Sequence, residues 1–187
     1  MKKIAIVFHS GYGHTQRQAE AVLAGAAAVA GIEAKLYPVT QLNDDQWKEL
    51  DTADALIFGS PTYMGSAAAK FKEFMETSSG RWYGRAWADK IAAGFTCSAS
   101  QNGDKLNTLV EMMIFAAQHG MLWVGLNLLP GNNNSKGSVN DLNRLGSSSG
   151  AMAQANADQD ADAMLDSDLK TASLLGQRVA ETLLRLR

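Results

Sequence analysis

The chain has 187 residues, of which 46% are hydrophobic and 19% are charged, so it is long enough for one globular domain with a substantial core. Its formal net charge of −2 excludes general electrostatic binding to DNA, RNA or an anionic membrane, and no run approaches the roughly 18 apolar residues that span a bilayer. Cys97 is the only cysteine, which excludes an intramolecular disulfide and a cysteine-based zinc cluster. We therefore predict a single cytoplasmic domain, residues 1–187, with no membrane insertion and no nucleic-acid partner.

Short aliphatic runs alternate along the chain with longer segments of helical periodicity. In chain order the pattern predicts strand Lys3–Phe8, helix Ala19–Val29, strand Glu33–Pro38, helix Asp44–Leu50, strand Ala55–Ser60, helix Ala67–Thr77, strand Ile91–Cys97, helix Asn107–Gln118, strand Met121–Asn127 and helix Ser167–Leu186. This alternation is typical of an α/β fold, a doubly wound five-stranded parallel sheet in strand order 2-1-3-4-5 with helices on both faces. The segment Gly131–Asp166, rich in Asn, Ser, Gly, Ala and Asp, predicts a long surface loop or a poorly ordered flap.

The turn after the first strand has the residues of a phosphate site. Ser10, Gly11, Gly13 and Thr15 lie between a buried strand and a helix, so backbone amides, two hydroxyls and the helix dipole can converge on one anion. A nucleoside triphosphatase loop needs Lys where His14 stands, and the third glycine of the dinucleotide fingerprint is missing, so a monophosphate fits better than a pyrophosphate. The same residues would also serve as a tight turn with a helix cap, and this alternative stays open.

Two further small polar loops follow the third and fourth predicted strands, at Pro61–Gly65 and Thr96–Gly103. In a doubly wound sheet, ligands bind beyond the carboxyl ends of the strands, where the winding direction reverses. Three neighbouring loops of this kind suit one flat polar ligand that carries a phosphate at one end. We infer that the ligand is FMN.

The sequence resembles the flavodoxin-like fold and, within it, the tryptophan-repressor-binding-protein type of NAD(P)H:quinone oxidoreductase, of the NADPH-dependent FMN reductase family. The resemblance covers nearly the whole chain. It is carried by S-G-Y-G-H-T after the first strand, F-G-S-P-T-Y-M-G after the third, G-R-W-Y at Gly80–Tyr83 and Q-H-G at Gln118–Gly120. It implies FMN as cofactor, NADH or NADPH as co-substrate, a quinone-like electron acceptor and a homo-oligomer, a dimer or tetramer. The linking segment Leu42–Asp54 is shorter than its counterpart in the family.

The resemblance also implies roles for individual residues. The expected cofactor-binding residues are Ser10, Gly11, Tyr12, Gly13, His14 and Thr15 at the phosphate, Pro61, Thr62, Tyr63, Met64 and Gly65 beside the ring, and Cys97, Ser98, Ala99, Ser100, Gln101 and Asn102 at the ring edge. Trp82 and His119 match family positions that line the substrate and nicotinamide space, so Trp82 is expected to bind substrate and His119 to be catalytic. Arg81 is expected to bind substrate because of its charge, not because of the resemblance. By their positions alone, Trp82 would be a packing residue and His119 could equally be a helix-end histidine. We predict no metal site.

The leading hypothesis is therefore an FMN-dependent oxidoreductase that transfers hydride from NAD(P)H to a quinone or similar small acceptor. One alternative is a flavodoxin-like electron carrier that docks to redox proteins, although such carriers normally present a strongly acidic face and the net charge here is only −2. A second alternative is a non-catalytic flavin-binding interaction protein.

Overall fold

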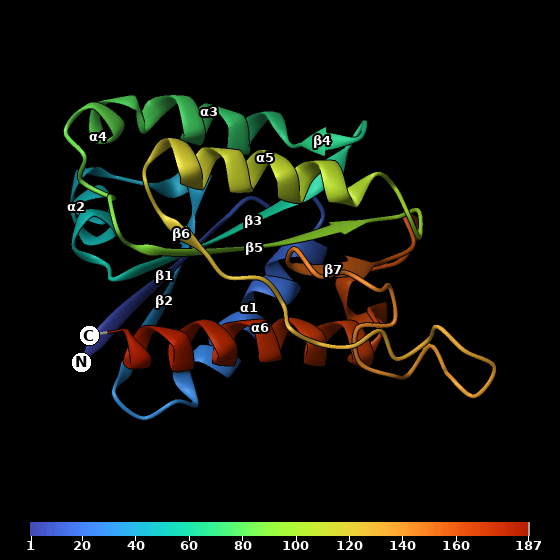
Figure 1. Cartoon of the computed structure of the whole chain (residues 1–187). Coiled ribbons are helices and arrows are strands. Elements are labelled where there is room, and N and C mark those ends of the chain that lie inside the picture. The colour runs from blue at the N-terminus through green and yellow to red at the C-terminus, as the bar shows by residue number, and fades with distance from the viewer. Residues whose placement is uncertain (187) are drawn as a thin grey trace.

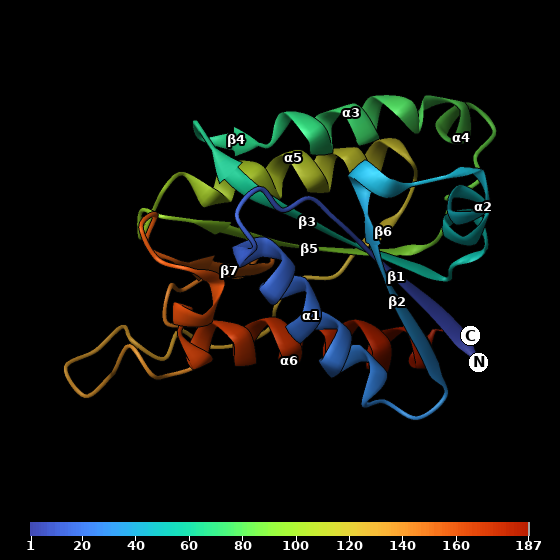
Figure 2. The same ribbon diagram turned by 180° about the vertical axis from the view of Figure 1, so that it is seen from behind.

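The computed structural model describes residues 1–186 and has a parallel sheet between two layers of helices (Figures 1 and 2). The strands are β1 (Lys2–Phe8), β2 (Ile32–Pro38), β3 (Ala55–Tyr63), β4 (Ser66–Ala67), β5 (Ile91–Ser98), β6 (Leu122–Trp123) and β7 (Ala151–Gln154). The helices are α1 (His14–Ala27), α2 (Asp44–Thr52), α3 (Ala69–Thr77), α4 (Ser79–Tyr83), α5 (Lys105–Gln118) and α6 (Asp166–Arg185), with single 3-10 turns at Val39–Gln41 and Ala161–Ala163. The strand order β2-β1-β3-β5-β6 confirms the predicted doubly wound sheet.

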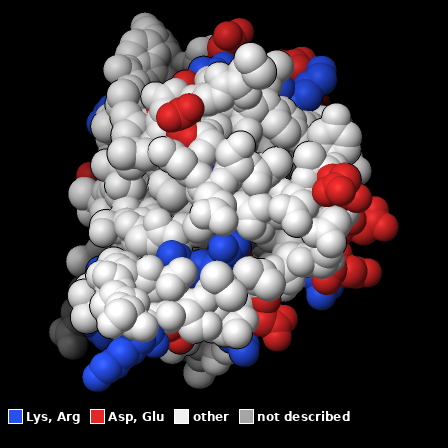
Figure 3. Space-filling view, turned by 90° about the vertical axis from the view of Figure 1, so that its right-hand side faces the viewer, with Lys and Arg blue, Asp and Glu red and all other residues white. Residues whose placement is uncertain are grey.

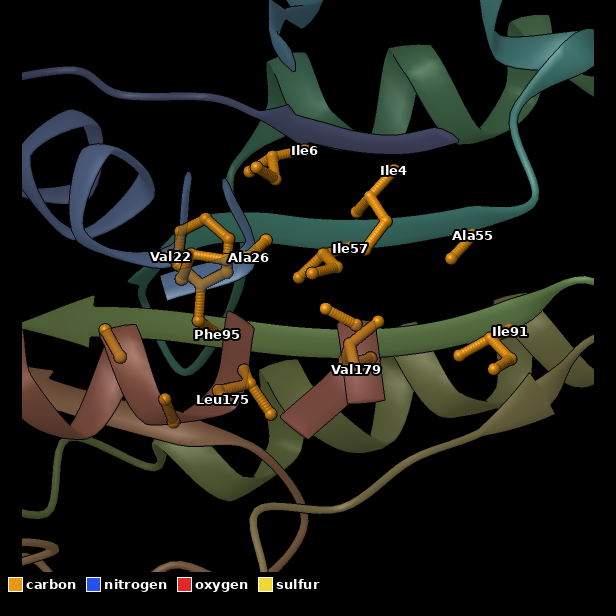
Figure 4. Close-up of a cluster of buried hydrophobic side chains, with 14 of the residues drawn as sticks. Ile4, Ile6, Val22, Ala26, Ala55, Ile57, Ile91, Phe95, Leu175 and Val179 are labelled. Carbon is orange, nitrogen blue, oxygen red and sulfur yellow. The ribbon is translucent and has the colours of Figure 1, made fainter. Parts of the chain in front are cut away.

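Alternating side chains of the strands divide the core into two parts. In β1, Ile4 and Ile6 belong to the core under α1 and α6, whereas Ala5 and Val7 belong to the core under α2, α3 and α5. Because successive side chains of a strand point to opposite faces, an uninterrupted aliphatic run is buried only when both faces are covered. Figure 4 shows the first of these cores, where side chains of β1, β3 and β5 meet those of α1 and α6.

Glycines allow α1 and α6 to pack closely. A Cβ on Gly25 of α1 would overlap the carbonyl group of Ser173, and a Cβ on Gly176 of α6 would overlap the carbonyl group of Val22. The two helices lie side by side across one face of the sheet (Figures 1 and 2). This contact fixes α1, and therefore the turn that precedes it, relative to the sheet.

The fifth position in the sheet differs from the prediction. Only β6 of the predicted strand Met121–Asn127 pairs with β5, against Ile91 and Ala92, and the chain then leaves the sheet. It returns as β7, which pairs in parallel with the other end of β5, from Phe95 to Ser98. The prediction that Gly131–Asp166 forms a long loop or flap is therefore wrong in part, because β7 lies within this segment and completes the fifth position of the sheet.

A buried asparagine holds the segment that separates β6 from β7. The side-chain amide of Asn143 donates to the carbonyl oxygens of Leu128 and Ser147, both at 2.9 Å, and its side-chain oxygen accepts from the Ser147 amide at 2.9 Å. The next residue, Arg144, forms a buried ion pair with Asp168 of α6 at 2.7 Å. The hydrogen bonds of Asn143 satisfy backbone groups that a loop leaving a sheet would otherwise bury unpaired, and the ion pair joins the segment to α6.

The predicted helices are all present, with ends that differ by a few residues. The largest difference is at α1, which begins at His14 because Gly13 adopts the left-handed conformation, with φ 90°, and acts as its N-cap. The short helix α4 was not predicted as a separate element. Within residues 1–186, no helix is both long and apolar enough to cross a membrane.

Candidate functional site

The loops that follow β1, β3 and β5 meet around a cavity of about 600 Å³ at the carboxyl edge of the sheet. Its walls are formed by Ser10, Tyr12, His14, Thr15, Pro61, Thr62, Tyr63, Met64, Gly65, Cys97, Ser98, Ala99, Ser100, Gly103, Asp104, Ala155 and Ala157. The volume lies in the usual range for a small-molecule or cofactor site, about 300 to 1,000 Å³. Seen from this edge, the surface is mostly uncharged, and Lys or Arg atoms are visible at the bottom of a hollow (Figure 3).

The start of α1 forms one end of the cavity and presents free hydrogen-bond donors. The amide of Gly13 donates to the hydroxyl of Ser10 at 3.1 Å, which fixes the turn, but no side chain caps the helix. The amides of the first turn of any α-helix have no intrahelical acceptor, and because no side chain caps this helix they stay available to a ligand. The helix dipole also places partial positive charge there. Thr15, only 2% exposed, lies in this first turn and contributes to the wall. This donor set is suited to a phosphate group.

The loop after β3 is a tight hairpin that carries an aromatic side chain into the cavity wall. Strand β3 continues past the predicted end and pairs antiparallel with β4, Tyr63 opposite Ser66. Met64 and Gly65 at the turn both have positive φ, 49° and 75°, as a two-residue hairpin turn requires. The ring of Tyr63 meets that of Tyr12 edge-on, with centroids 6.3 Å apart. The two rings offer an apolar surface at the mouth of the cavity, and burial raises the pKa of the Tyr63 hydroxyl.

The loop after β5 is held from inside by a lysine. The ammonium of Lys105 donates to the hydroxyl of Ser98 at 2.7 Å and to the carbonyl oxygens of Ser100 and Gln101 at 2.9 and 2.7 Å. Gly103 has φ 56°, and a Cβ there would overlap the Ser98 hydroxyl. The loop is therefore compact and fixed, and it presents Ser98, Ser100 and their neighbours as a polar wall of the cavity.

Cys97 lies at the floor of the cavity and is almost fully buried. Burial raises the pKa of its thiol to about 12. A thiol with such a pKa stays protonated at neutral pH and is a poor nucleophile. We therefore assign Cys97 to the wall of the site and give it no chemical role.

A fourth wall of the cavity comes from a segment that sequence reasoning missed. Ala155 and Ala157 follow β7, and the same segment is held against α1 because the Nε2 atom of His14 lies 2.8 Å from the carbonyl oxygen of Gln159. Since a carbonyl oxygen only accepts, His14 carries a proton on Nε2. The alternation of Ala with larger side chains in Ala151–Gln154 after Gly150 was the sequence signal that could have revealed this strand.

Most of the predicted cofactor residues lie in the cavity wall, but a few do not. Gly11 and Gly13 shape the first loop, and Gln101 and Asn102 belong to the third, without lining the cavity. Gly103 and Asp104 line it and were not predicted.

The three residues assigned to catalysis and substrate binding lie elsewhere within this chain. His119 follows the far end of α5, whose 14 residues span about 20 Å from the cavity. Arg81 and Trp82 belong to α4, at the same far edge of the sheet (Figure 1). The guanidinium of Arg81 lies 4.2 Å from the ring centroid of Trp47.

Within one chain His119 is a packing residue of the core, and its expected catalytic role stays a prediction. It is 2% exposed and packs against the rings of Trp87 and Phe115, at centroid distances of 4.5 and 4.8 Å. The Ser78 hydroxyl donates to the carbonyl oxygen of Met75 and so accepts from His119 Nε2 at 3.0 Å. Burial, aided by the nearby charge of Arg85, lowers the pKa of His119 to about 4. The ring is therefore neutral at pH 7, and within one chain it is buried at the end of α5 that lies away from the cavity.

The residues of the cavity fit FMN. The free amides of α1 and the Ser10 and Thr15 hydroxyls provide the donors a phosphate needs, and the volume and the Tyr63 side chain suit a flat ring. Among residues 1–186 there is no group of three or more His, Cys, Asp or Glu side chains that could hold a metal ion.

Comparisons with known proteins agree with this fit. Residues 39–133 match the family model described as NADPH-dependent FMN reductase. The chain is 44% identical over 181 residues to Flavodoxin FldP of Pseudomonas aeruginosa, covering 96% of each chain. It is 34% identical over 145 residues to an NAD(P)H dehydrogenase (quinone) of Aromatoleum aromaticum, covering 66% of this chain and 70% of the relative. A solved flavodoxin, WrbA-like protein from Agrobacterium tumefaciens shares 40% identity and superposes with a TM-score of 0.78 over 100% of both chains. These similar proteins thus include, by name, both flavodoxins and a quinone dehydrogenase.

Proposed function

Because the chain belongs to the NADPH-dependent FMN reductase family, we propose that it binds FMN in the cavity at the carboxyl edge and transfers electrons from NADH or NADPH to a quinone or similar small acceptor. FMN would supply the redox chemistry, since its ring accepts the electrons of a hydride and passes them on. The protein would position the ring, control access to it and adjust the charge around it.

The free N-terminal amides of α1 carry this proposal. With Ser10 and Thr15 they would bind the phosphate, and this end of the cavity would set the direction in which the rest of the cofactor lies. The hairpin Pro61–Gly65 and the loop Ser98–Asn102 would then flank the ring and its polar edge. Backbone and hydroxyl donors in these loops would bind the ring in one orientation.

The mouth of the cavity favours a small substrate. Hydride transfer requires the nicotinamide to contact the ring directly, and the quinone must then use the same face. Met64 at the hairpin turn is fully exposed, and Tyr12 and Tyr63 present apolar surface beside it. A mostly uncharged mouth (Figure 3) suits an aromatic substrate and lacks the strong acidic face expected of an electron carrier that docks to proteins.

The roles expected for Arg81 and Trp82 would require a second copy of the chain. Within one chain they lie at the edge of the sheet opposite the cavity, so only the homo-oligomer predicted from the sequence could bring them to a substrate. Replacing Trp82 by Ala should then weaken the NAD(P)H or quinone interaction without changing FMN affinity. A cytoplasmic location, expected from the single cysteine, would give access to reduced nicotinamides.

The direct test is to load the purified protein with FMN and mix it anaerobically with NADH or NADPH. We expect the flavin absorbance to bleach without the addition of a second protein, and to recover when a benzoquinone is added. If the flavin stays oxidised with both nicotinamides, the hydride-transfer proposal is wrong. A protein that cannot be loaded with FMN would overturn the cofactor assignment as well.

A flavodoxin-like electron carrier is the second candidate, favoured by the 44% identity to Flavodoxin FldP. In that case NADPH would bleach the flavin only after a flavoprotein reductase is added. The two functions are therefore separated by whether the chain itself accepts hydride.

A further inference from the structure

Lys105 is a buried cation without a carboxylate partner. It is 1% exposed, and its three hydrogen bonds to Ser98, Ser100 and Gln101 use every proton of the ammonium group. Across the part of the chain that the structure describes, no carboxylate forms an ion pair with it. Asp168 is also buried, but the guanidinium of Arg144 binds both of its oxygens, at 2.9 and 2.7 Å.

Burying a cation of this kind lowers stability, and a negative charge in the cavity would offset that cost. Taking an ammonium group out of water is costly even when its protons are hydrogen-bonded, and neutral acceptors compensate it only in part. The same burial lowers the pKa of Lys105 to about 8, so the group is mostly charged at pH 7. The charged or titratable groups that act on it are the Cys97 thiol, Asp168 and Arg144, and Asp168 is neutralised by its ion pair with Arg144. The preceding residue, Asp104, is exposed at the cavity, and in the described part of the chain it forms no ion pair with Lys105.

The cation lies directly behind the cavity wall. Two of its three hydrogen-bond partners, Ser98 and Ser100, line the cavity, and Cys97 and Asp104 beside them line it as well. A negative charge in this part of the cavity would therefore face Lys105 across a thin layer of protein, where low polarity strengthens the attraction between charges.

We infer that Lys105 is a charge-positioning residue of the FMN site, which stabilises the negative charge that the isoalloxazine ring gains on reduction. This inference rests on the proposed function, because it requires FMN in the cavity. Uptake of two electrons and one proton leaves the ring with one net negative charge, whereas the oxidised ring is neutral. Lys105 therefore favours the reduced cofactor over the oxidised one, and its three hydrogen bonds fix the distance at which it does so.

The competing interpretation is that Lys105 only ties the loop together. If Lys105 only holds the loop in place, replacing it should change the affinities for oxidised and reduced FMN equally. If it acts as a fixed charge, replacing it should change mainly the affinity for reduced FMN. The ratio of the two affinities, which is the midpoint potential of bound FMN relative to free FMN, separates the interpretations.

The test compares two variants of the full-length protein loaded with FMN. Lys105→Met keeps the length of the side chain and removes the charge. Ser98→Ala keeps the charge and removes one of the three hydrogen bonds by which Lys105 holds the loop. For each protein the dissociation constant of oxidised FMN and the midpoint potential are measured at pH 7.

We expect Lys105→Met to lower the affinity for reduced FMN, relative to oxidised FMN, by at least about tenfold, which is about 30 mV in a two-electron couple. Ser98→Ala should change both affinities together and leave their ratio within about twofold, or about 9 mV. Equal potentials in the wild type and Lys105→Met would overturn the inference and leave FMN binding intact. Failure of the wild type to bind FMN would overturn both proposals.

The wild type provides a second test that needs no variant. If the reduced ring attracts Lys105, reduction raises the pKa of the lysine, and between its two pKa values reduction takes up one additional proton. The midpoint potential should then fall by about 30 mV per pH unit near pH 7 and by about 60 mV per pH unit above pH 8. A constant slope from pH 7 to 9.5 would show that the lysine and the ring do not interact.

Discussion

Gly11 and Tyr63 come from different loops and lie so close together that a Cβ on Gly11 would be 2.5 Å from the Tyr63 hydroxyl oxygen. The contact joins the turn after β1 to the hairpin after β3. A glycine at position 11 therefore determines how far the Tyr63 side chain can reach over the first loop.

Replacing Gly11 by Ala should displace the Tyr63 ring and change the shape of the ring site. The tip of a tyrosine side chain can move without unfolding the protein, so we expect a melting temperature close to that of the wild type. The affinity for FMN should fall by about tenfold, which corresponds to about 1.4 kcal/mol. Titration of the apoprotein, with quenching of FMN fluorescence as the signal, would measure the change. Restored affinity in the double variant Gly11→Ala, Tyr63→Phe would show that the displaced hydroxyl is the cause.

Replacing Thr15 by Val tests the phosphate site. The variant keeps the shape of a buried side chain and removes one hydroxyl, and a hydrogen bond to a charged oxygen contributes about 1.5 to 3 kcal/mol. We therefore expect FMN to bind about 10- to 100-fold more weakly. Riboflavin, which has no phosphate, should bind the variant and the wild type equally.

Thr77→Val is the matched control for Thr15→Val, since Thr77 is exposed at the end of α3 and lies outside the cavity wall. It should leave FMN affinity unchanged. Equal FMN affinity in Thr15→Val and the control would mean that the Thr15 hydroxyl is only part of the helix start and does not bind the phosphate.

Replacing Gly25 by Ala tests the close contact of α1 and α6. The added methyl group would overlap the backbone of Ser173, so the helices must move apart. Overpacking of this kind destabilises a protein by about 1 to 3 kcal/mol. Thermal unfolding should show a clear fall in melting temperature. Gly80→Ala in α4, where no atom lies within 4 Å of the new methyl group, should show no fall, and a fall of similar size there would contradict the explanation.

The burial of His119 predicts a loss of stability in acid. Its pKa is about 4 in the folded protein and about 6.5 in the unfolded chain, so the unfolded chain takes up the proton first as the pH falls. This contribution to stability is complete above pH 6.5 and is lost progressively as the pH falls toward 4. It amounts to about 2 to 3 kcal/mol between pH 7 and pH 4.5.

The variant His119→Gln should lack this part of the pH dependence. Urea unfolding of both proteins at pH 7 and pH 4.5 gives the difference, in which the carboxylate titrations common to both proteins cancel. We expect the wild type to lose more free energy of unfolding than the variant over this range. Equal losses would mean that His119 titrates normally in the folded protein.

Much of the site could be predicted because the order of the chain fixes it. Ser10–Thr15, Pro61–Gly65 and Ser98–Ser100 lie at or just beyond the carboxyl ends of neighbouring parallel strands, and these ends meet at one edge of the sheet. The same rule places His119, which precedes a strand, at the opposite edge. The position of His119 in the sequence therefore predicts its place in the fold, whereas its expected catalytic role stays a prediction.

The sequence by itself determined most of the helices and strands, the strand order of the sheet and the edge at which a ligand binds, because the pattern of buried residues in a strand and the periodicity of a helix are properties of short segments. Only the tertiary structure decided that β6 and β7 share the fifth position, that Ala155 and Ala157 form a wall, and that Lys105 is buried behind the Ser98 loop. These features depend on contacts between segments distant in the chain or on how a loop folds back on itself. A local pattern of residues does not specify which distant atoms will exclude water from a side chain, and that exclusion gives Lys105 and His119 their unusual chemistry.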